Sequence, residues 1–188
     1  SSYKPLAEVE HPLLAKGVVI EDAGGRSVLC AVDWCELCNS THDAFRAAIA
    51  EAARTSPSRV AVQAVHQHTA PMGDADAMRI IAEIPEPPPY PAVGVFENGR
   101  ARVVAAVKEA LGRMQPFDRV GRSQARVERV ASNRRVPMGE GKVGFRASSC
   151  RDPELIAKPE GLIDPFVKTI TFARGDTSVA RLHHYATH

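Results

Sequence analysis

The chain of 188 residues contains 44% hydrophobic and 24% charged residues, which is enough apolar material for the core of a globular domain and excludes a disordered chain. Its 24 basic and 22 acidic residues give a formal net charge of only +2, so no charge excess favours nucleic acid or an anionic membrane surface as a partner. No stretch reaches the roughly 20 apolar residues of a membrane span. The expected partner is a small molecule.

The first third of the sequence predicts a β-α-β unit. Two apolar runs, 13–20 and 27–32, flank a Gly-Gly turn and are typical of a β-hairpin. Ser40 or Thr41 is suited to cap the helix that follows. The near-continuous apolar run 60–65 then predicts a strand that is covered on both faces.

The rest of the sequence predicts two more helices and a second set of strands. A short helix through Ile81 is followed by a proline cluster at 84–91, which we expect to form an ordered surface loop. Apolar residues within 96–114 fall on one face of a helix of about five turns. Then come a half-exposed strand at 119–130, an irregular segment at 139–159, and a hairpin that joins strands 166–172 and 178–185.

These elements predict an α/β fold, with α+β as the alternative, built on a mixed β-sheet with flanking helices and β-hairpins. Residues 1–188 are expected to form a single domain. The sequence begins at Ser1 without a methionine, so we expect residues to be missing upstream.

His66 and His68 follow the strand predicted at 60–65. Residues i and i+2 of an extended segment point to the same side, so both side chains are expected to project together from the carboxyl end of this strand. Ligands collect at that end in open α/β sheets, and imidazole is a common zinc ligand. The pair therefore predicts a zinc site, and two histidines within a polar loop are the alternative.

Three further histidines, His183, His184 and His188, crowd the end of the last predicted strand. Two strand ends could bring the two histidine groups together. His183 and His184 point to opposite faces, so at most one of them reaches a common site, and a core or edge position is the alternative for each.

Two aspartates and one cysteine pair are also candidates for a site. Asp33 and Asp164 could orient a zinc histidine by accepting its other N–H, and a turn or capping role is the alternative. Cys35 and Cys38 form a C-x-x-C pair that no second such pair follows. Free structural thiols are the preferred interpretation, with a redox pair or half of a zinc ribbon as alternatives.

Six segments, 11–20, 28–33, 66–71, 133–135, 162–165 and 185–188, form an ordered set that spans most of the chain. In their order and spacing they resemble the N-terminal catalytic domain of the neutral/alkaline non-lysosomal ceramidases. The resemblance implies that the chain is the N-terminal portion of such a domain and is truncated at both ends. It also implies a secreted or periplasmic location, for which the chain itself carries no signal.

The resemblance implies roles for four residues. His66 and His188 match zinc ligands of the family, and His68 matches a histidine that stays off the metal and holds or polarises the scissile amide. Arg134 matches the arginine that contacts the polar head of the substrate. The family draws a glutamate and a tyrosine ligand from further along its chain, so a downstream region of the same protein is needed to complete the site.

The implied activity is zinc-dependent hydrolysis of an amide bond, in a ceramide-like N-acyl substrate or a related lipid-like small molecule of sphingolipid metabolism, by attack of a zinc-bound water. An imidazole and a guanidinium suit the negative charge that develops on a carbonyl oxygen. The loop after the histidines reads His-Gln-His-Thr-Ala-Pro-Met-Gly, where the family often has His-Thr-His-Ser-Gly-Pro-Gly. The alternatives are a metal hydrolase of the TIM-barrel type, against which the hairpins argue, and a non-catalytic ceramidase-like binding module.

Overall fold

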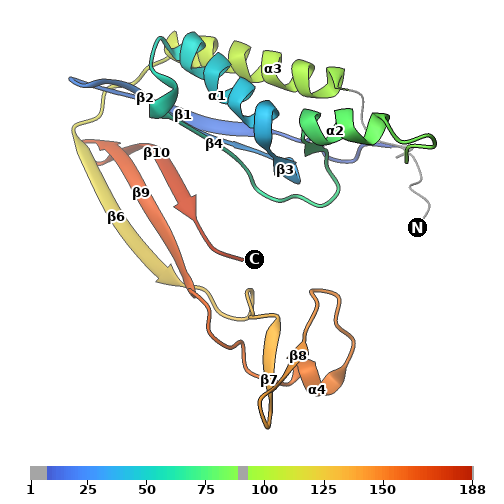
Figure 1. Cartoon of the computed structure of the whole chain (residues 1–188). Coiled ribbons are helices and arrows are strands. Elements are labelled where there is room, and N and C mark those ends of the chain that lie inside the picture. The colour runs from blue at the N-terminus through green and yellow to red at the C-terminus, as the bar shows by residue number, and fades with distance from the viewer. Residues whose placement is uncertain (1–7, 89–92, 188) are drawn as a thin grey trace. The chain divides into compact units, whose positions relative to one another are not determined.

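The computed structural model describes residues 8–88 and 93–187 (Figure 1). They belong to two compact units, an N-terminal unit that ends at Met114 and a C-terminal unit that begins at Gln115. Each unit is described by itself. The expectation of a single domain over the whole chain stays a prediction.

The N-terminal unit contains the predicted β-α-β unit. Strand β1 (Ala15–Asp22) pairs antiparallel with β2 (Gly25–Val32), and β2 pairs parallel with β4 (Val60–Ala64). The crossover between the two parallel strands contains α1 (Asn39–Ala53) and a short 3-10 turn, η1 (Pro57–Arg59). This mixed sheet confirms the predicted fold class and the predicted hairpin.

Two more helices and a small second sheet complete the N-terminal unit. Helix α2 (Ala75–Ala82) and the long helix α3 (Gly94–Leu111) confirm the predicted helices. Strands β3 (Glu36–Leu37) and β5 (Met72–Gly73) pair parallel beyond the carboxyl ends of β2 and β4. The prediction of an ordered proline loop falls partly on residues 89–92, which lie outside the described residues.

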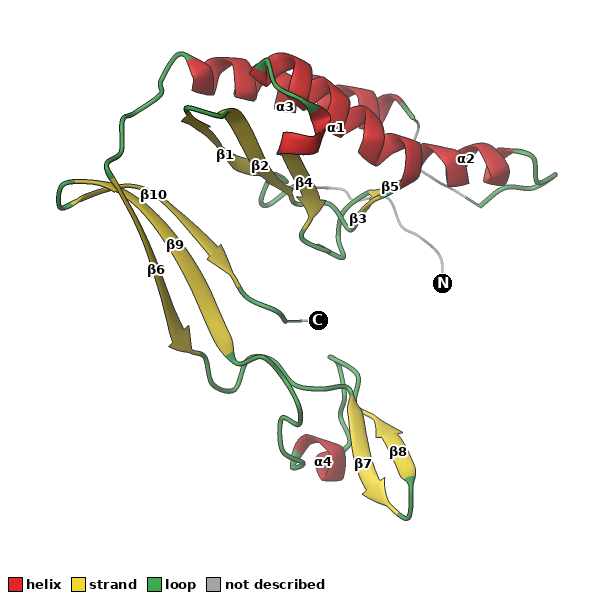
Figure 2. Cartoon of the chain, turned by 60° about the vertical axis from the view of Figure 1, so that its left-hand side comes forward, coloured by secondary structure: helices red, strands yellow, loops and turns green. Residues whose placement is uncertain are grey.

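Helices α1 and α3 lie on one face of the three-stranded sheet, as Figures 1 and 2 show. Along β4, Val60 and Val62 are buried, whereas Ala61 and Gln63 are exposed. The prediction of a strand covered on both faces is therefore wrong for this chain. Alanine raises the apparent hydrophobicity of the outer face, although both valines of β4 lie on the inner one.

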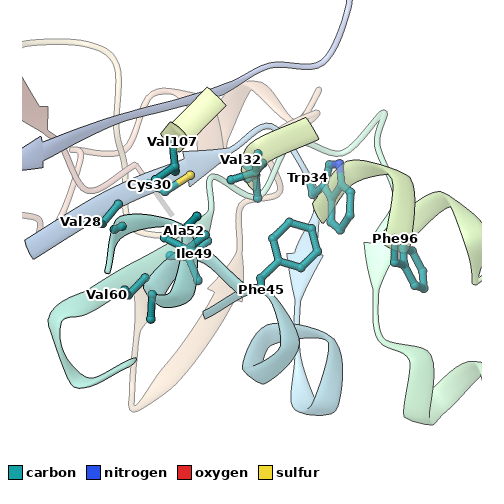
Figure 3. Close-up of a cluster of buried hydrophobic side chains, with 14 of the residues drawn as sticks. Val28, Cys30, Val32, Trp34, Phe45, Ile49, Ala52, Val60, Phe96 and Val107 are labelled. Atoms are coloured by element: carbon teal, nitrogen blue, oxygen red, sulfur yellow. The ribbon is translucent and has the colours of Figure 1, made fainter. Parts of the chain in front are cut away.

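The core of this unit forms between the sheet and the two helices (Figure 3). Phe45 and Ile49 of α1 are almost fully buried in it. The indole of Trp34 lies 5.3 Å from the ring of Phe45 and 5.7 Å from that of Phe96, measured between centroids. A Cβ atom at Gly73 would lie 2.9 Å from this indole, and one at Gly99 would lie 2.7 Å from it. Only glycine leaves room for Trp34 at both positions.

The start of α1 differs from the prediction. Cys38 is the N-cap residue and provides no side-chain cap, while Ser40 and Thr41 lie inside the helix. Asp76 of α2 instead accepts a hydrogen bond from the Ser40 amide at 2.8 Å. Thr41 Oγ1 accepts one from the first amide of α2, Ala75, also at 2.8 Å. The two helices cap each other, a tertiary arrangement that local sequence does not show.

The C-terminal unit contains two antiparallel sheets. The larger has the order β10-β9-β6 and consists of β6 (Arg119–Arg126), β9 (Phe166–Arg174) and β10 (Thr177–His184). It confirms the predicted hairpin and the presence of a strand within 119–130, but this strand ends at Arg126 and all of its residues are exposed, so the prediction of a half-exposed strand is wrong. None of the helices in residues 8–88 and 93–187 is long and apolar enough to cross a membrane.

The smaller sheet was not predicted. Strands β7 (Arg135–Gly139) and β8 (Lys142–Phe145) form a hairpin, and a one-turn helix, α4 (Pro153–Ile156), follows. The expectation of an irregular segment at 139–159 is wrong for these residues. Glu140 and Gly141, with φ angles of 50° and 73°, form the kind of tight turn that joins twisted strands.

Candidate functional site

The histidine pair lies where the parallel strands β2 and β4 end. The backbone bonding between these strands continues past their last residues, because the Val65 amide donates to Val32 O at 3.1 Å. One step further, the Gln67 amide donates to Trp34 O at 3.2 Å. The segment that contains both histidines is therefore held along the chain that follows β2.

His66 and His68 lie against each other, with ring centroids 4.8 Å apart and ring planes at 84°. The backbone reason differs from the prediction, because His66 has a φ of 64° and is in the left-handed region, not in an extended segment. Such a conformation is uncommon for a residue with a side chain and is concentrated at functional sites. His66 is half-buried and His68 is exposed.

The Nδ1 atom of His66 lies 3.0 Å from the backbone carbonyl oxygen of Cys35, and 3.9 Å from the Cys35 thiol. A carbonyl only accepts hydrogen bonds, so this contact favours the tautomer with the proton on Nδ1 and the lone pair on Nε2. Histidines that bind zinc almost always donate their other ring N–H in this way. The surroundings of His66 therefore fit a ligand that binds through Nε2.

A complete metal site is not assembled by the described part of the chain. Within residues 8–88 and 93–187, no three side chains of histidine, cysteine, aspartate or glutamate are grouped so that they could hold a metal ion. His188, the second expected ligand, lies outside the described residues. Its role and that of His66 as zinc ligands stay predictions.

Both aspartate candidates form local structural bonds. Asp33 Oδ2 accepts a hydrogen bond from the Leu14 amide at 3.0 Å. Asp164 accepts one from the Phe166 amide at 3.2 Å and another from the Lys168 ammonium. These bonds, first that to Lys168, lower the pKa of the Asp164 carboxyl. Turn and strand-end contacts therefore account for both aspartates.

Arg134 belongs to the C-terminal unit and precedes β7. It is half-buried, whereas Arg135 is exposed. Asn133 holds the segment, since its Nδ2 donates to Leu162 O at 3.2 Å and its Oδ1 accepts from the Arg135 amide at 2.9 Å. The predicted Asn-Arg motif is thus a structured turn, and the role of Arg134 toward a substrate stays a prediction.

The late histidines of β10 are edge residues within this unit. His183 is exposed, and its Nδ1 lies 2.9 Å from Thr169 Oγ1 on the neighbouring strand. His184 is exposed and pairs across the sheet with Lys168. An edge position, one of the alternatives given for both, describes them within this unit.

The cysteines have free thiols. Burial raises the pKa of the Cys30 thiol to about 11. Partial burial, and then the nearby carboxylates of Glu36 and Asp74, raise the pKa of Cys38 above its ordinary value. Neither thiol is electrostatically activated as a nucleophile.

Two contributors were absent from the predicted site. The Cys35 carbonyl is a backbone atom, and only the alignment of β2 with β4 could have placed it opposite His66. Arg146, which bonds to the Asn133 carbonyl, has no sequence signal, because arginines are mostly exposed.

The comparisons with known proteins point to one fold. No model of a protein family matches the sequence, and no curated protein matches it. A solved structure described as a ceramidase complexed with C2 matches with a TM-score of 0.55 and 18% sequence identity. The match covers 91% of this chain and 25% of the ceramidase chain, so this chain spans about a quarter of that length. The chain shares the fold of part of a ceramidase.

Proposed function

We propose that the chain forms part of the active site of a zinc-dependent hydrolase that cleaves an amide bond in a ceramide-like N-acyl substrate. The observation that carries the proposal is the contact of His66 Nδ1 with the Cys35 carbonyl, which favours a lone pair on Nε2, as is typical of histidines that bind zinc. The shared fold with a ceramidase supports the choice of reaction and of a lipid-like substrate.

His66 would hold the zinc ion together with His188. Zinc bound there would supply Lewis-acid activation of water and of the amide carbonyl. Catalytic zinc is usually held by about three protein ligands, so the downstream region of a longer chain would provide the rest. Two histidines alone would bind zinc weakly.

His68 and Arg134 would act on the substrate. The His68 ring is in contact with that of His66, so it would lie beside a metal bound by His66 without having to be a ligand. An imidazole N–H and a guanidinium would stabilise the negative charge that develops on the amide oxygen. Arg134 would bind the polar part of the substrate.

The alternative of a TIM-barrel metal hydrolase fits the structure poorly. A TIM barrel requires eight parallel strands in repeated β-α units. The described residues instead form antiparallel hairpins in both units and a single parallel pair within the main sheet.

The test uses the protein at its full natural length. We expect about one zinc per chain by elemental analysis, and hydrolysis of a short-chain N-acyl sphingosine that chelation abolishes and zinc restores. His66→Ala should remove both the zinc and the activity. His68→Ala should keep the zinc and lower kcat by roughly 10²- to 10³-fold. His42→Ala, in α1 of the same unit, is the matched control and should change neither.

Two results would contradict the proposal. One is an absence of zinc in the full-length protein, and the other is undiminished hydrolysis by His66→Ala. Binding of the N-acyl lipid without turnover would instead identify a binding module.

A further inference from the structure

Arg146 is buried in the C-terminal unit, with only 8% of its surface exposed. Arginine is almost never buried to this extent unless it is paired. Its guanidinium donates to four backbone carbonyl oxygens: Leu155 O at 2.9 Å, Lys158 O at 2.8 Å, Pro159 O at 2.9 Å and Asn133 O at 3.3 Å. One cation therefore ties together two stretches of backbone that lie far apart in sequence.

One of these stretches contains the Asn-Arg motif. The guanidinium of Arg146 bonds to the carbonyl of Asn133, and the backbone amide of Arg146 bonds to the carbonyl of Arg134 at 2.7 Å. Arg146 thus contacts the two backbone carbonyls on either side of the Arg134 Cα atom. Arg146 therefore holds the backbone of Arg134 through two consecutive carbonyl groups, those of residues 133 and 134.

The second stretch, residues 155–162, forms hydrogen bonds with Asn133. The Asn133 amide donates to Glu160 O at 2.7 Å, and its side chain donates to Leu162 O. The three carbonyls at 155, 158 and 159 that Arg146 also binds lie directly before these acceptors. Arg146 therefore organises the loop after α4 as well as the motif that this loop supports.

We propose that Arg146 is a positioning residue that holds Arg134 in place for the substrate. The inference rests on the proposed function, which assigns Arg134 to the polar part of the substrate. A guanidinium suits this task because its N–H groups form a rigid planar fork that reaches several carbonyls at once. A lysine ammonium is a single point with three donors and cannot satisfy the same four acceptors.

The first experiment follows hydrogen exchange and needs no activity. Arg146→Lys and Arg146→Met are compared with wild type in the full-length protein. We expect faster amide exchange in residues 131–136, with no change in the β9–β10 hairpin. Arg151→Met, which removes an exposed arginine just before α4, is the control and should leave both segments unchanged. Faster exchange everywhere in Arg146→Met would mean that this variant has unfolded, and the milder Arg146→Lys then decides.

The second experiment is a double-mutant cycle on amide hydrolysis. Arg146→Lys should lower kcat/KM by roughly 10- to 100-fold, as expected for a misplaced substrate group. In an Arg134→Ala background the same substitution should cause almost no further loss, since the residue that it positions is gone. A purely structural role would instead give the same loss in both backgrounds.

The outcomes separate this inference from the proposed function. Unchanged exchange at 131–136 in both Arg146 variants, or equal losses in both backgrounds, would overturn the positioning role. A wild-type protein without amide hydrolysis would contradict the proposed function and with it the substrate part of this inference. The exchange result would still decide whether Arg146 holds the Arg134 segment.

Discussion

The imidazole of His66 is bonded to the backbone carbonyl of Cys35. Nδ1 lies 3.0 Å from the Cys35 carbonyl oxygen, while the thiol of the same residue is 3.9 Å away. Carboxylate partners of zinc histidines can be removed by mutation, and their loss typically lowers metal affinity about 10- to 100-fold. A carbonyl partner is retained whatever side chain the residue carries.

Cys35→Ala is therefore expected to leave zinc affinity nearly unchanged, within about threefold of wild type. The carbonyl contact would persist, and only the weak thiol contact would be lost. Competition with a chromogenic chelator measures the affinity, and His66→Ala is the comparison that should abolish binding. A loss of tenfold or more in Cys35→Ala would mean that the thiol itself takes part in the site.

Arg134 and Arg135 form a matched pair for testing substrate contact. Arg134→Ala should lower kcat/KM for the N-acyl substrate by roughly 10²-fold, since a charged donor to the substrate is removed. Arg135→Ala, which removes the exposed neighbour, should stay within about twofold of wild type. Steady-state kinetics on both variants tests this, and equal effects would contradict the assignment.

Gly99 lies against Trp34, which makes it sensitive to a single methyl group. A Cβ there would come within 2.7 Å of the indole, whose opposite side is confined by Gly73. Gly99→Ala should lower the free energy of unfolding by about 1–2 kcal/mol, because overpacking exceeds the gain in helix propensity. Urea unfolding followed by the fluorescence of Trp34, the one tryptophan of the chain, measures the change.

Gly94→Ala is the control on the same helix, because a Cβ at that position would meet none of the described residues within 4 Å. Its unfolding free energy should equal or slightly exceed that of wild type. If both alanine variants behave alike, Trp34 is not as confined as described.

Cys30 should make stability depend on pH in the alkaline range. Burial raises its pKa from 9.0 to about 11, so the folded state holds a proton that the unfolded state loses first. The stabilisation is complete below pH 9 and is lost as the pH rises toward 11, by up to about 3 kcal/mol. Cys30→Ala should lack this component. Urea unfolding of both proteins at pH 8.5 and 11 gives the difference, and parallel losses would refute the assignment.

Local patterns predicted most of the elements. Helix α3 and the β1–β2 and β9–β10 hairpins follow from apolar periodicity and glycine turns that lie within each segment. The β7–β8 hairpin was missed because Pro137 and three glycines make its strands resemble a loop. The cap of α1 was misassigned because the acceptor is Asp76 of another helix.

The sequence predicted which side chains belong to the candidate site, but not the backbone groups that hold them. The spacing of His66 and His68 predicted side chains that project together from an extended segment; the rings lie side by side, but on a left-handed backbone at His66. The left-handed backbone of His66 and the carbonyl of Cys35 depend on how β2 and β4 are aligned, which only the folded chain defines. Arg146 was missed for a similar reason, since its four partners are backbone atoms.

Trp34 links the hydrophobic core of the N-terminal unit to the loop that contains His66 and His68. Its side chain fills the space between Gly73 and Gly99, and its carbonyl holds the Gln67 amide between the two histidines. Substitutions that shift the indole would therefore also shift the histidine loop. Random mutagenesis scored by activity should find loss-of-function changes at these two glycines, because a side chain at either position would displace the indole.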